Sequence, residues 1–224
     1  MISQHLGGIV APEEEWEGPR LVVVGLDPGM TTGVSIIPWP LGMVSQLGVA
    51  ASGSRVDWVS GEVVRTDGDN RDGFGDSRHV DRIMDQIRDG WALMEEDRGD
   101  VHVVVMESFS LRLMNSDPSL ISPAVVGKMV RDRLYRAGEF APMLFMQTPA
   151  DAKRTVTNDR LKRWGMYREG SEHAKDAMRH NLLFMRKFVQ DASMQRRVLG
   201  CTIGEYLVKC SGSRSGLRSG SRSG

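Results

Sequence analysis

The sequence predicts an α/β fold built on a mixed five-stranded sheet, with three antiparallel strands plus two parallel ones, flanked by helices. Two observations carry this prediction. Residues 21–27 and 101–107 are continuous apolar runs that each end in an acid, which is typical of strands buried on both faces. The order of elements is the second observation, because three strands come first and helices then alternate with strands.

The first half of the chain contains four of the expected strands. Three of them are predicted at residues 21–27, 34–39 and 55–65. The turn after the first is short and contains glycine, so the first two strands should form an antiparallel hairpin. A polar, glycine-rich loop at 66–76 precedes a helix at 81–95, which leads into the strand at 101–107. This helical crossover predicts that the strands at 21–27 and 101–107 are parallel.

The second half of the chain completes the sheet and adds extensions. We expect a helix at 124–137, a strand at 143–147, a basic segment at 151–164, and a helix from Ser171, as its N-cap, to about residue 189. The predicted organisation is an acidic N-terminal arm at 1–19, one globular domain at 20–190, a C-terminal extension at 191–210 and a Ser/Gly/Arg tail at 211–224. The tail cannot bury a core, so we expect it to be disordered.

The net charge of zero conceals two unlike halves. Residues 1–149 hold 13 Lys and Arg against 22 Asp and Glu, whereas residues 150–224 hold 16 against 7. Such asymmetry indicates that the basic part binds a polyanion. The chain has no secretory signal and no apolar run of about 18 residues, and Cys201 and Cys210 fit neither a disulfide framework nor a zinc site. We therefore expect a cytoplasmic protein that does not enter membranes.

Acidic residues stand where buried runs meet turns or helices. Asp27 ends the first strand and Glu107 the fourth, while His173 and Asp176 lie three positions apart on the last helix and so share one of its faces. The ends of neighbouring parallel strands meet at the crevice where α/β sheets place ligands. Clustered carboxylates are hard oxygen ligands that suit Mg²⁺ or Mn²⁺, and two such ions can promote phosphodiester hydrolysis.

Four motifs carry a resemblance to a known family. GLDPGMTTGVSII, VVVMESF, QTPADAKR and EHAKDAM, in this order, resemble the RuvC-type Holliday junction resolvases of the RNase H-like superfamily over about residues 21–187. The resemblance implies an RNase H-like fold and a homodimeric endonuclease of DNA recombination and repair. Such an enzyme cuts Holliday junctions or other branched DNA with two Mg²⁺ or Mn²⁺ ions per active site. The extensions resemble those of bacteriophage members, which would act in the host cytoplasm.

The resemblance also assigns site residues. It implies that Asp27, Glu107, His173 and Asp176 are catalytic and hold the metal ions. It also implies that a basic residue, Lys153 or Arg154, lies near the attacked phosphate, and Lys153 is the one we expect to be catalytic. Phe109 would press on base pairs near the crossover. The candidate DNA-binding residues are Phe109, Arg112, Lys153, Arg154, Arg160, Lys162 and Arg163.

Alternatives remain open at this stage. A related nuclease could act on flaps, forks or RNA-containing hybrids, and a non-catalytic module could bind junctions without cutting them. Residues 27–33 also resemble the first phosphate loop of the actin-like and sugar-kinase ATPases. Such enzymes need a second lobe with a second phosphate loop, and only one lobe fits this chain. An EF-hand at residues 67–78 fails because Arg78 stands where a glutamate is needed. His180 is two turns from His173, which favours a satisfied histidine over a zinc ligand.

Because imidazole is softer than carboxylate, Mn²⁺ should support activity at least as well as Mg²⁺.

Overall fold

Five strands form one sheet in the computed structural model, which describes residues 18–45, 58–65, 75–92, 100–108, 118–136 and 143–215. The strands are β1 (Arg20–Asp27), β2 (Thr31–Pro40), β3 (Val59–Val64), β4 (Val101–Glu107) and β5 (Met143–Gln147). Their order across the sheet is β3-β2-β1-β4-β5. The pairs β1–β2 and β2–β3 are antiparallel, whereas β1–β4 and β4–β5 are parallel. The predicted α/β class and mixed sheet are confirmed, and they agree with the RNase H-like fold that the motifs imply.

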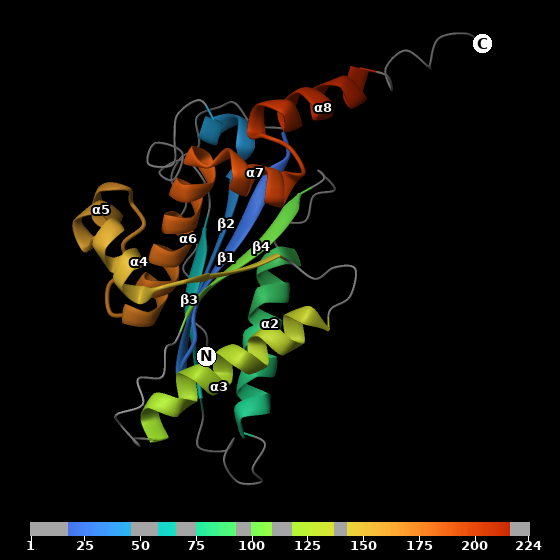
Figure 1. The fold of residues 1–224 in the computed structure, drawn as a ribbon. Coiled ribbons are helices and arrows are strands. Elements are labelled where there is room, and N and C mark those ends of the chain that lie inside the picture. The colour runs from blue at the N-terminus through green and yellow to red at the C-terminus, as the bar shows by residue number, and fades with distance from the viewer. Residues whose placement is uncertain are drawn as a thin grey trace.

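Helices cover both faces of this sheet (Figure 1). One face carries α2 (Gly75–Ala92) and α3 (Pro118–Tyr135). The other carries α4 (Pro149–Thr155), α5 (Asn158–Arg163), α6 (Glu172–Gln190), α7 (Ala192–Leu199) and the start of α8 (Ile203–Ser215). Among the helices of the described ranges, none has the length and apolar character needed to span a membrane.

The residues of β1 alternate between two apolar clusters. Leu21 and Val23 pack with residues of α6, whereas Val22, Val24 and Leu26 pack with residues of α2 and α3, and all five side chains are fully buried. This two-sided burial explains why the strand is an unbroken apolar run. The apolar side chains of α3 belong to the second cluster, so they pack against the sheet of the same chain.

Several boundaries differ from the predicted ones. Helix α2 begins at Gly75, six residues before the predicted start at residue 81. The sequence pattern does not reveal this start because the first turns are mostly polar and show no apolar period, although Val80 is fully buried. Helix α3 begins at Pro118 and contains Pro123, so its start precedes the predicted residue 124. Residues 211–215 belong to α8, so disorder beginning at residue 211 is wrong for this part of the tail. The acidic arm up to residue 17, the loop at 66–74, Phe109 and Arg112 lie outside the described residues.

Candidate active site

Two glycines let α6 lie directly on the sheet beside the end of β1. A Cβ atom at Gly33 would stand 1.9 Å from the carbonyl oxygen of His173, and one at Gly25 would stand 2.2 Å from that of Ala177. His173 and Ala177 are one helical turn apart, so two successive turns of α6 rest on glycine. Any larger residue would push the helix away from β1 and β2. This close approach places the first turn of α6 next to Asp27.

Asp27 ends β1 in a nearly buried position, with 6% of its surface exposed. His173 Nδ1 lies 2.8 Å from Asp27 Oδ2, and it donates when the carboxylate is ionised. Burial, and after it the charge of Glu107, raise the pKa of Asp27 to about 7, although the hydrogen bond from His173 opposes both. Asp27 is thus a carboxylate whose surroundings disfavour its charge unless a cation is near.

Glu107 ends β4 and is held by a histidine that the motifs did not include. His180 Nε2 lies 3.2 Å from Glu107 Oε2, and His180 is 1% exposed. Because Nε2 donates to the carboxylate, Nδ1 must accept, and the amide nitrogen of Gln147 is its donor at 3.2 Å. Gln147 ends β5, so this chain of contacts joins β4, β5 and α6. His180 is therefore a satisfied core histidine, as expected, and it orients Glu107.

Asp176 is held by two cationic side chains. Lys153 of α4 places Nζ 3.0 Å from Asp176 Oδ2, and the guanidinium of Arg179 pairs with the other carboxylate oxygen. Arg179 is buried and also donates to the carbonyl of Val156 at 3.2 Å and to the side chain of Asn158. The carboxylate of Asp176 therefore links α6 to α4 and α5.

Asp27, Glu107 and Asp176 lie at one end of the sheet, but each of them contacts a different partner side chain. Asp176 also raises the pKa of Asp27, which shows that the carboxylates share one electrostatic environment. Even so, no group of three or more His, Cys, Asp or Glu side chains within the described ranges is arranged to hold a metal ion. The predicted ligands instead form the pairs Asp27–His173 and Glu107–His180 and the cluster around Asp176.

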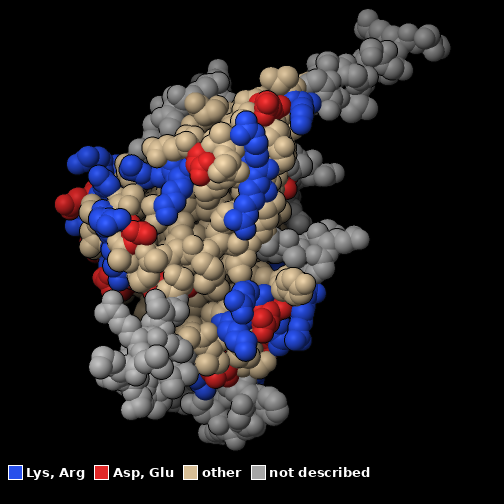
Figure 2. Space-filling model, in the orientation of Figure 1, with Lys and Arg blue, Asp and Glu red and all other residues tan. Residues whose placement is uncertain are grey.

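Basic side chains gather next to this site. Figure 2 shows Lys and Arg over the helices of the α6 face. The predicted DNA-binding residues described here are Lys153, Arg154, Arg160, Lys162 and Arg163, all on α4 and α5. The side chain of Arg154 is 80% exposed although it pairs with Asp151, and Lys162 lies 4.8 Å from the ring centroid of Tyr167. These two short helices present positive charge to solvent beside Asp176.

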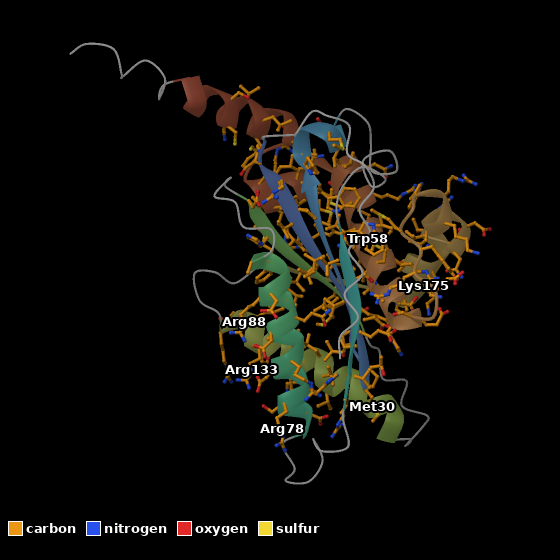
Figure 3. All side chains as sticks on the ribbon, turned by 180° about the vertical axis from the view of Figure 1, so that it is seen from behind. Met30, Trp58, Arg78, Arg88, Arg133 and Lys175 are labelled. Atoms are coloured by element: carbon orange, nitrogen blue, oxygen red, sulfur yellow. The ribbon has the colours of Figure 1, made fainter. Side chains whose placement is uncertain are left out.

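The ring of Tyr167 also receives a buried cation from α6. Lys175 Nζ lies 4.9 Å from its centroid, and the side chain of Lys175 is 3% exposed. A hydrogen bond to Glu172 raises the pKa of Lys175, so this side chain stays charged. Figure 3 shows Lys175 on the far side of the sheet from Arg78 and Arg88 of α2. The contact fastens the first turns of α6 to the segment that follows α5.

Besides His180 and Arg179, the sequence prediction missed two further residues that hold the site, Glu62 and His79. Glu62 of β3 accepts hydrogen bonds from the backbone nitrogens of His173 at 3.1 Å and Ala174 at 3.4 Å. Ser171 occupies the N-cap position as predicted, but its side chain makes no capping hydrogen bond. His79 of α2 is fully buried, with Nε2 2.9 Å from the carbonyl oxygen of Gly29 in the turn after Asp27. The sequence gives no distinct signal for Glu62, because the predicted strand at 55–65 contains other polar and charged residues as well.

Comparisons with known proteins give one structural likeness. No protein-family model and no curated protein matches the sequence. A similar solved structure is T. thermophilus RuvC in complex with a Holliday junction substrate. The TM-score is 0.48 at 13% sequence identity, and the alignment covers 81% of this chain and 99% of that chain. This likeness concerns the fold alone.

Proposed function

We propose that this chain is a metal-dependent endonuclease that hydrolyses branched DNA, with the Holliday junction as its substrate. One observation carries the proposal: Asp27, Glu107 and the His173–Asp176 pair, which come from three distant parts of the sequence, share one end of the sheet beside basic helices. The motifs that contain these residues are those that resemble the resolvases.

The donor set fits divalent cations of the Mg²⁺ and Mn²⁺ type. Three carboxylates supply hard oxygen ligands. Burial and, after it, the charge of Glu107 raise the pKa of Asp27, so a bound cation would favour its charged form. Asp27, Glu107, His173 and Asp176 would hold the ions. Two bound ions would stabilise the attacking and leaving oxygens of a phosphodiester displacement.

The chain's own residues would orient the metal ligands and bind the substrate. His180 fixes the direction of Glu107, and Asp27 fixes the ring of His173, so neither carboxylate swings freely. Lys153 is 57% exposed and pairs with Asp176, so it can exchange this partner for a backbone phosphate of DNA. The remaining basic residues of α4 and α5 would bind the backbone without reading sequence.

The dimer and the base-pair wedge are parts of the same proposal. A homodimer would present two such sites to the two sides of a junction, and Phe109 would press on the base pairs near the crossover. Sedimentation of the free protein tests the first part. Substitution of Phe109 by alanine, followed by cleavage of a junction at saturating protein, tests the second.

A second candidate function is junction binding without cleavage. The observation that favours it is the lack, in the described part of the chain, of three side chains placed to hold one ion. Lys153 and Arg179 already neutralise Asp176 there. Under this alternative the basic helices would bind DNA and the acids would be structural.

A substrate panel separates the two functions. Labelled four-way junctions, forks, flaps, RNA–DNA hybrids and linear duplexes of shared sequence are incubated with the protein in Mg²⁺, in Mn²⁺ and in chelator. The proposal expects metal-dependent cuts in the junction and none in the linear duplex. Binding without cuts in either metal supports the non-catalytic module, and preferential cutting of forks, flaps or hybrids contradicts the proposed substrate.

A further inference from the structure

We propose that Glu62 is a positioning residue that holds the first turn of α6, and with it His173, in place for metal binding. The inference rests on the proposed function only in taking His173 and Asp27 as metal ligands. Glu62 lies on β3, 111 residues from His173 in sequence, and no motif contains it.

Strand register places Glu62 and Asp27 on either side of a glycine. Gly33 of β2 pairs with Asp27 of β1 on one side and with Glu62 of β3 on the other. Directly paired residues of antiparallel strands point to the same face, and neighbouring strands lie about 4.8 Å apart. The two acidic residues therefore stand about 10 Å apart on the face that α6 covers, with Gly33 between them.

The first turn of α6 occupies the space above that glycine. The carbonyl oxygen of His173 would be only 1.9 Å from a Cβ atom at Gly33. On one side Asp27 contacts the imidazole of His173 at 2.8 Å, and on the other Glu62 accepts from its backbone nitrogen at 3.1 Å. His173 is thus fixed at both its ring and its backbone.

Glu62 performs the capping role that Ser171 does not. The nitrogens at the start of a helix lack partners within the helix, and the helix dipole makes this end positive. The carboxylate of Glu62 satisfies the nitrogens of His173 and Ala174 and carries the favourable charge. Arg168 also donates to the carbonyl of Ser60, so β3 is bound to the segment before α6 as well.

Removing this carboxylate should loosen the helix start without removing a metal ligand. Asp176 lies one turn beyond His173, so both predicted ligands of α6 depend on this turn. Residues that orient ligands commonly change metal affinity or activity by about 10–100-fold when they are replaced. We expect a loss of Mn²⁺ affinity in that range for Glu62→Ala. Glu62→Gln keeps an oxygen acceptor and should recover most of it.

Asp191 offers a matched control. Its carboxylate accepts from the backbone nitrogens of Ser193 at 2.8 Å and Met194 at 3.3 Å, at the start of α7 and away from the site. Asp191→Ala therefore removes the same kind of cap. It should lower the melting temperature about as much as Glu62→Ala while leaving Mn²⁺ affinity at the wild-type value.

The experiment titrates Mn²⁺ alone into the four proteins by calorimetry and records the His173 ring resonances by NMR in chelator. Weaker Mn²⁺ binding in Glu62→Ala, recovery in Glu62→Gln and normal binding in Asp191→Ala support the proposal. Equal weakening in Asp191→Ala, or unchanged binding and an unchanged His173 ring in Glu62→Ala, overturns it. If the wild type binds no Mn²⁺, the proposed function fails, and the ring resonance in metal-free protein still decides the role of Glu62.

Discussion

Asp27→Asn should make the metal-free protein more stable, although it removes a central acid of the site. Burial and the charge of Glu107 raise the pKa of Asp27 from 3.8 to about 7, so the folded state resists its ionisation. At about 1.4 kcal/mol per pH unit, this difference corresponds to about 4 kcal/mol of lost stability at pH 8. Asparagine has nearly the same shape and carries no charge, so it avoids this cost. For a chain of this size the melting temperature should rise by roughly 8–16 °C.

The sign of the pH dependence follows from the same shift. Between pH 3.8 and about 7 the folded state binds the proton of Asp27 more tightly than the unfolded state does. The stability that the folded state gains by binding this proton is therefore complete below pH 3.8 and is lost as the pH rises through about 7. The stability gap between Asp27→Asn and wild type should be small near pH 4, grow through pH 7 and remain constant above pH 8.

Urea unfolding in chelator at pH 4.5, 6 and 8 measures this gap. Asp100 supplies the control, because its nearly buried carboxylate pairs with Arg20 at 2.6 Å, and Asp100→Asn should destabilise the protein at pH 8. A variant Asp27→Asn that is no more stable than wild type at pH 8 would refute the electrostatic argument. Added Mn²⁺ should stabilise wild type and have little effect on Asp27→Asn.

Three further predictions follow from the packing, the ligands and the basic helices. Gly33→Ala should destabilise the protein by about 1–3 kcal/mol and weaken Mn²⁺ binding, because the new Cβ meets the His173 carbonyl. Gly204→Ala is the control and should do neither, because a Cβ there has nothing within 4 Å. Equal urea midpoints for the two variants would contradict this prediction. Cleavage in Mn²⁺ should at least equal that in Mg²⁺, and clearly faster cleavage in Mg²⁺ would argue against His173 as a ligand. Arg163→Ala should weaken junction binding and reduce the slope of log affinity against log salt by about 1, measured by anisotropy in chelator; an unchanged slope would remove Arg163 from the DNA surface.

The sheet was predictable because its central strands are buried on both faces. β1 and β4 are unbroken apolar runs, and the structure places them side by side and parallel, as the crossover helix predicted. The acids that end these runs consequently lie at the same edge. Positions 173 and 176 could be placed on one helix face from their spacing alone.

The contacts that hold the site were not predictable in the same way. Glu62 acts through backbone nitrogens of a helix that is remote in sequence, so no local pattern marks its role. The pairing of Glu107 with His180 likewise depends on how α6 crosses β4. The starts of α2 and α3 were placed too late because polar first turns and an internal proline obscure the apolar period.

Cleavage of a four-way junction tests the central claim most directly. Wild type and Asp27→Asn are compared in Mn²⁺ on one end-labelled junction, at protein concentrations that give equal occupancy in a binding assay. Wild type should cut the junction, while Asp27→Asn should bind it and leave it intact. Cutting by Asp27→Asn at the wild-type rate, or no cutting by wild type, would contradict the account.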